Sequence, residues 1–145
     1  MTTPMVPTVR FAQEDPSGLA SMLGELIAQN LSRDPQRRRL LRPSISSIEV
    51  PDADVAATIR LTPSQVTIAD GLDATATVRV RASSDRLMAL VAAPLRFGLP
   101  DVLHTEGRSV VADLIRGRIR VHGLIRHPRQ VARLTLVLSV LEIRS

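Results

Sequence analysis

Cysteine, tryptophan, tyrosine and lysine are all absent from this 145-residue chain, and its only aromatic residues are Phe11 and Phe97. Without cysteine, disulfide frameworks, thiolate metal sites and thiol catalysis are excluded. Without lysine, neither a Schiff-base lysine nor the lysine of a phosphate-binding loop is available. The scarcity of aromatic rings argues against single-stranded nucleic acid as a partner, because such proteins usually stack bases on them.

The length of the chain predicts one domain with a sizeable hydrophobic core. Residues 1–13 contain Pro4 and Pro7 and show no hydrophobic periodicity, so we expect a flexible N-terminal arm followed by a single domain over residues 14–145. Neither a signal peptide nor a membrane-spanning run is recognisable, which favours a cytoplasmic protein.

The hydrophobic pattern divides the chain into helical and strand-like stretches. Helix starts are predicted at Asp15-Pro16 and at Asp34-Pro35, where aspartate caps the helix and proline occupies its first position. The spacing then changes from the helical period to alternation, which predicts four successive strands at 48–50, 55–62, 66–68 and 74–81. The remaining predicted elements are helices from Ser83, Ser109 and Pro128 and a short strand over residues 119–121.

The strands come as one run with short connections, so the pattern predicts an α+β fold. One face of each strand is apolar and the other polar, which is typical of an antiparallel sheet covered on one side only. Five arginines fall on the exposed face. We favour a solvated face that opposes aggregation over a docking surface for phosphates or an anionic membrane. These arginines are Arg60, Arg79, Arg81, Arg118 and Arg120.

Small side chains are predicted on the covered face of the sheet, at Ala57, Ala74 and Ala76. The last helix, by contrast, is apolar over most of its circumference and carries Leu134 and Leu138 on its main stripe. This combination could leave an apolar cavity suited to a hydrocarbon ligand. Closer approach of the helices could equally fill the space.

Catalytic and metal-binding signals are weak. His122 and His127 do not have the spacing of a zinc site, and no metal or other cofactor is predicted. His104 lies near Asp101 and Glu106 in a loop rich in proline and glycine, which is the one cluster that resembles a titratable site. We favour a solvated loop histidine over a catalytic one and predict that the protein is not an enzyme.

The order of elements in the second half adds a resemblance. A strand leads directly into a Ser-Asp-capped helix over residues 78–90, and a leucine-rich helix closes the chain over 128–141. Between them stands Gly117-Arg118-Ile119-Arg120-Val121-His122-Gly123, a basic and aliphatic strand between two glycines. With these features residues 74–138 resemble the sterol carrier protein type 2 (SCP2) domain, and the first half agrees through its leading helix and the Asp34-Pro35 start.

The resemblance implies a five-stranded, mostly antiparallel sheet with one face covered by about five helices and an apolar tunnel between the layers. It implies a non-enzymatic carrier of a fatty acid, an acyl-CoA or a sterol-like lipid. Arg96 and Arg108 are the candidates to meet a charged head group. The candidate lining residues are Leu87, Leu90, Val91, Leu114, Ile119, Leu134 and Leu138.

The expected partner is a lipid or another hydrophobic small molecule, with no nucleic acid and at most transient contact with a membrane surface. The alternative is an interaction module on the same fold, with a filled core and no lipid. In that case the second apolar stripe of the last helix, which includes Leu136, would form a homodimer interface.

Overall fold

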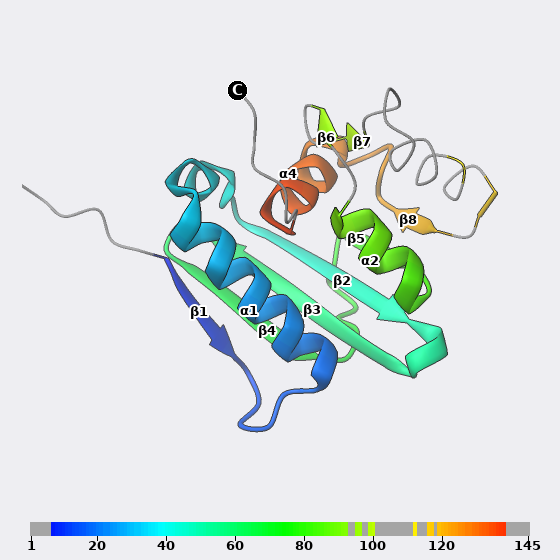
Figure 1. Ribbon diagram of the computed structural model, residues 1–145, viewed down its shortest axis with the longest axis horizontal. Coiled ribbons are helices and arrows are strands. Elements are labelled where there is room, and N and C mark those ends of the chain that lie inside the picture. The colour runs from blue at the N-terminus through cyan, green and yellow to red at the C-terminus, as the bar shows by residue number, and fades with distance from the viewer. Residues whose placement is uncertain are drawn as a thin grey trace, which may run out of the picture.

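The computed structural model describes residues 7–92, 95–96, 99–100, 112, 116–117 and 119–138. A six-stranded mixed sheet in the order β1-β4-β3-β2-β5-β8 forms its centre (Figure 1). The strands of this sheet are β1 (Thr8–Phe11), β2 (Ser44–Val50), β3 (Val55–Thr62), β4 (Gln65–Asp70), β5 (Val78–Arg81) and β8 (Arg120–His122). The α-helices are α1 (Gly18–Arg33), α2 (Ser84–Ala92) and α4 (Pro128–Leu138); η1 (Pro35–Leu40) and η2 (Pro51–Ala53) are 3-10 helices, and β6 (Leu95–Arg96) pairs with β7 (Leu99–Pro100).

The α+β class is confirmed, but the prediction of a five-stranded, mostly antiparallel sheet is wrong. The sheet gains a sixth strand, β1, which pairs in parallel with β4, and β5 pairs in parallel with β2. The expected number of helices, about five, is also wrong: the described part of the chain contains three α-helices. The helix predicted from Asp34-Pro35 is the 3-10 helix η1, and the one predicted from Ser109 lies outside the described residues except for Ala112.

Strand β1 arises from the segment that we expected to be a flexible arm, so that prediction is wrong for Thr8–Phe11. The strand is held at the sheet edge by its pairing with β4 and by Phe11, whose ring packs against Gly24 of α1. A side chain at position 24 would occupy the space of that ring. The prediction of one domain over residues 14–145 stays a prediction.

Helix α1 begins at Gly18 rather than at Asp15-Pro16. Ser17 caps it by accepting a hydrogen bond from the amide of Ala20 (3.2 Å). The carboxylate of Asp70, at the end of β4, accepts the amide hydrogen of Ser17 at 3.0 Å and thus fixes the cap to the sheet. The helix therefore begins at the cap that a contact with the sheet holds in place, Ser17, and not at the local signal of Asp15.

Helices α1 and α4 cover the apolar face of the sheet (Figure 1). Asn30 joins the two helices, because its side-chain amide donates to the carbonyl of Val137 at 2.8 Å. The predicted inward position of Ala57 is confirmed, since it is fully buried. Those of Ala74 and Ala76 are wrong: Ala74 is exposed and Ala76 half-buried, because β5 begins only at Val78.

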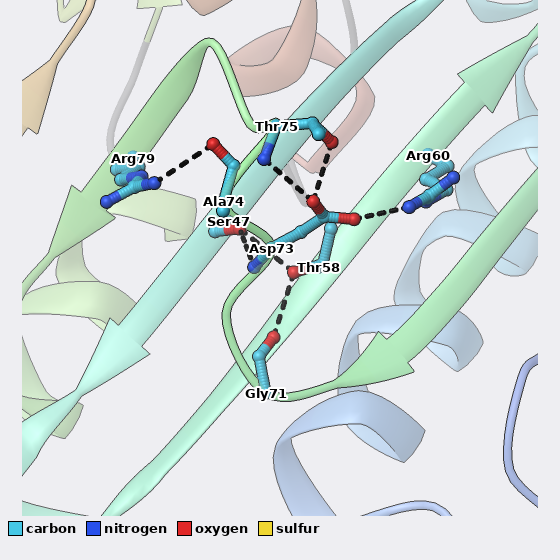
Figure 2. A network of polar contacts seen from close by, with 8 residues as sticks. All are labelled: Ser47, Thr58, Arg60, Gly71, Asp73, Ala74, Thr75 and Arg79. Carbon is cyan, nitrogen blue, oxygen red and sulfur yellow. Dashed lines mark hydrogen bonds and ion pairs between the residues drawn. The ribbon is translucent and has the colours of Figure 1, made fainter.

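Residues 71–77 cross the polar face of the sheet and bring β5 to the far side of β2, which explains the parallel pairing (Figure 2). Ser47 and Thr58 form a buried hydroxyl pair at 2.9 Å beneath this segment. Thr58 donates to the carbonyl of Gly71 at 2.8 Å, and the amide of Asp73 donates to Ser47 at 3.3 Å. Polar residues on the outer face of two strands thus determine the path of the connection.

The boundaries in the second half agree well with the prediction. Helix α2 begins at Ser84, whose amide donates to Asp52 at 3.0 Å. Gly117 and Gly123 both have positive φ, as expected of glycines that end elements on either side of a strand. Helix α4 begins at Pro128 as predicted.

Candidate functional site

The buried face of α4 forms the centre of an aliphatic layer over the sheet. Val131, Leu134, Val137 and Leu138 are all buried on this face. They belong to one hydrophobic cluster together with the apolar side chains of the sheet and of α1. Val137 is fully buried as well, so the apolar face of α4 is broader than the predicted stripe that carries Leu134 and Leu138.

Four of the seven predicted lining residues are in this cluster. Leu87 on α2, Ile119 just before β8, and Leu134 and Leu138 on α4 are at most 6 % exposed. The structure therefore brings three segments of the second half together around one aliphatic layer. Whether these side chains line a ligand stays a prediction.

The other predicted site residues have no described side chains. Leu90 and Val91 lie in α2, and Arg96 lies in β6. Leu114 and Arg108 lie outside the described residues, as do the three residues of the weak catalytic cluster, His104, Asp101 and Glu106. Their roles stay predictions.

Gln130 fixes the first turn of α4 to strand β2 and to the end of the crossing segment. Its side-chain oxygen accepts from the hydroxyl of Thr77 at 2.7 Å, and its side-chain nitrogen donates to the carbonyl of Ile45 and to the hydroxyl of Ser46, each at 3.1 Å. Sequence analysis missed this residue, because a single glutamine on an amphipathic helix does not reveal that its partners lie about 50 and 85 positions earlier.

A basic groove of about 760 Å³ opens beside this joint. It lies where the start of β2, the end of the crossing segment and the first turns of α4 meet. Sequence analysis missed it too, although four cationic or titratable side chains between positions 126 and 133 were a visible signal. It is lined by Pro43, Ser44, Ile45, Thr75, Thr77, Arg126, His127, Pro128, Arg129, Gln130 and Arg133.

Among the described residues, the carboxyl group with the most strongly shifted pKa lies on the opposite, polar face of the sheet. Hydrogen bonds from the hydroxyl and the amide of Thr75, together with the guanidinium of Arg60, lower the pKa of Asp73 from 3.8 to about 2 (Figure 2). Hydrogen bonds from Ser84 likewise lower the pKa of Asp52. Asp73 caps backbone two residues further along the chain, and Asp52 accepts the amide hydrogen at the start of α2, so both carboxylates have a structural role.

Metal chemistry has no support in the described ranges, where histidine, aspartate and glutamate nowhere gather in a group of three or more that could hold an ion. In the same part of the chain, none of the helices is long and apolar enough to cross a membrane.

Comparison with known proteins identifies the architecture. No family model matches the sequence, and no curated protein matches it significantly. A solved structure described as "UbiJ-SCP2 Ubiquinone synthesis protein" matches with a TM-score of 0.57 and 19 % identity, over 83 % of this chain and 92 % of that one. The chain has the SCP2-like fold. The predicted resemblance to the SCP2 domain is thereby confirmed at the level of the fold.

Proposed function

We propose that this protein is a non-enzymatic binder or carrier of a hydrophobic small molecule, held between the apolar face of the sheet and helices α2 and α4. The observation that carries the proposal is the aliphatic layer under α4 in an SCP2-like fold. Leu87, Ile119, Leu134 and Leu138 contribute only apolar surface, so they favour a ligand through burial rather than through directional bonds.

The ligand class follows from the chemistry of this layer and from the solved structure that has the same fold. The described part of the aliphatic layer contains no aromatic side chain, so it suits an acyl or prenyl chain better than a flat ring that needs stacking partners. The structural neighbour is described as a ubiquinone synthesis protein, so a prenylated quinone joins fatty acid, acyl-CoA and sterol in the set of candidates. A cytoplasmic location remains part of the proposal.

Substitution of Leu134 tests the proposal. In Leu134→Phe the larger ring fills space under α4, so binding of a fluorescent fatty acid and of a prenylated quinone should weaken at least tenfold, while circular dichroism retains the native signal. Leu72→Phe is the matched control, because Leu72 is 52 % exposed on the crossing segment and should leave binding unchanged. Equal binding by wild type and Leu134→Phe would refute the proposed location.

The alternative, an interaction module without lipid, predicts a different result. Leu136 on α4 is half-buried, so part of its side chain is available to a second copy. Sedimentation of the wild-type protein would then show a dimer, and Leu136→Glu would convert it to a monomer. A monomeric wild type that binds lipid would exclude this alternative.

A further inference from the structure

The turn between β8 and α4, residues 123–127, presents two aliphatic side chains to solvent. Ile125 is 94 % exposed, the highest value among the exposed large hydrophobic residues described, and its neighbour Leu124 is 37 % exposed. The turn is closed, because the amide of His127 donates to the carbonyl of Gly123 at 2.7 Å. The exposure of Ile125 is therefore imposed by a hydrogen-bonded turn.

Three arginines follow Leu124 and Ile125 in the sequence. Arg126, Arg129 and Arg133 line the basic groove of about 760 Å³. Within the described ranges, no protein group forms a hydrogen bond or an ion pair with any of these three guanidinium groups. Arg60 and Arg81, by contrast, each have a carboxylate partner, Asp73 and Glu49 respectively. The groove therefore holds cationic groups that no carboxylate in the described part of the chain neutralises.

The stretch of sequence around this turn carries basic residues and no acidic one. Residues 114–141 contain six arginines and no acidic residue, whereas the other 117 residues contain 13 basic and 14 acidic side chains. The net charge of +5 thus comes from this stretch alone. Such an asymmetry creates a local potential that attracts a polyanionic surface.

We propose that the β8–α4 turn docks the protein on anionic phospholipid bilayers, with Leu124 and Ile125 entering the headgroup region and Arg126, Arg129 and Arg133 contacting lipid phosphates. A bilayer satisfies both features at once, since it offers phosphates beside an apolar layer. A nucleic-acid duplex would engage the arginines but leave both aliphatic side chains in water. Docking does not rest on the proposed function, because a protein with a filled core would also bind the bilayer.

Vesicle co-sedimentation of the full chain tests this inference. Vesicles of three parts phosphatidylcholine to one part phosphatidylglycerol should bind the protein, and pure phosphatidylcholine should not. Arg126→Gln with Arg129→Gln should weaken binding roughly 30-fold, at about 1 kcal/mol per arginine. Ile125→Gln should weaken it at least about tenfold through lost apolar burial.

Matched controls separate docking from general charge effects. Arg10→Gln with Arg33→Gln removes two exposed arginines from other parts of the molecule and should leave binding within about threefold of wild type. The inference is overturned by absence of binding to anionic vesicles, by equal losses in the two double variants, or by tighter binding to duplex DNA that Ile125→Gln does not change. Lipid uptake by wild type and Ile125→Gln, measured without vesicles, should be equal.

Discussion

Replacing Gln130 with leucine should cost this protein much of its stability, because one side chain joins α4 to β2 and to the end of the crossing segment at Thr77. Gln130 is 9 % exposed and makes three hydrogen bonds. Two of its partners keep an alternative in the variant: Thr77 is exposed and can bond to water, and the carbonyl of Ile45 still accepts the amide hydrogen of Thr77 at 3.1 Å. Ser46 is 1 % exposed and loses its donor.

The expected loss of stability follows from what each of the three partners of Gln130 can bind in the variant. About 1 kcal/mol is lost for each of the two replaceable bonds, and about 1–3 kcal/mol for the buried hydroxyl of Ser46. Gln130→Leu should therefore lower the free energy of unfolding by roughly 3–5 kcal/mol, and the melting temperature by roughly 10–15 °C for a chain of this size. Urea unfolding followed by circular dichroism measures the first value, and a thermal scan measures the second.

Two further variants make the test specific. Gln29→Leu on the exposed face of α1 should change stability by less than about 0.5 kcal/mol. Adding Ser46→Ala to Gln130→Leu removes the unsatisfied hydroxyl, so the double variant should be at least about 1 kcal/mol more stable than additivity predicts. A Gln130→Leu variant as stable as Gln29→Leu, or strict additivity with Ser46→Ala, would refute the role assigned to Gln130.

Three other predictions concern the pH response, a turn and the aliphatic layer. Folding lowers the pKa of Asp73 to about 2, so the stabilising effect of its carboxylate is present above pH 3.8 and is lost as the pH falls toward 2. The difference in the free energy of unfolding between wild type and Asp73→Asn, measured in urea, should therefore disappear over that range. A difference that is constant with pH would contradict the assignment. Gly123→Ala should lower the free energy of unfolding by at least about 2 kcal/mol, because Gly123 has φ +92° and a Cβ there would collide with the carbonyl of Thr77. Gly71→Ala, at φ +87° in open space, should cost only the conformational strain of about 1 kcal/mol. Equal losses of stability in the two variants would show that the contact with Thr77 is absent. Leu134→Ala should cost about 2–5 kcal/mol in denaturant unfolding, clearly more than Leu136→Ala at a half-buried position, and the reverse order would contradict the burial of this face of α4.

Local patterns predicted the elements better than their arrangement. Alternation located β3 and β4, and glycine and proline signals located the ends of β8 and the start of α4, because these depend on residues close together in sequence. The position of β5 depends instead on Ser47 and Thr58 binding a segment 13 to 26 residues later, and sequence periodicity carries no record of that contact. Consecutive strands were therefore placed side by side, although β5 crosses to the far side of β2.

At the candidate site, too, features with a local sequence signal were predictable and features that depend on distant contacts were not. Leu87, Ile119, Leu134 and Leu138 were predictable as buried because aliphatic residues at helical or strand spacing face a core. The start of α1 and the contacts of Gln130 were not predictable, since the first depends on Asp70 and the second on β2 and Thr77, which are distant in sequence. The basic groove was predictable from the distribution of charge along the chain, but the sequence prediction considered only the arginines of the strands.

Native mass spectrometry of the freshly purified protein, followed by extraction into organic solvent, tests the proposed function most directly. The account predicts a species heavier than the 15.8 kDa chain by the mass of one hydrophobic molecule, and the same molecule in the extract. It also predicts that added fatty acid or prenylated quinone raises the melting temperature. A chain of unmodified mass, with an empty extract and no thermal shift from either ligand, would contradict it.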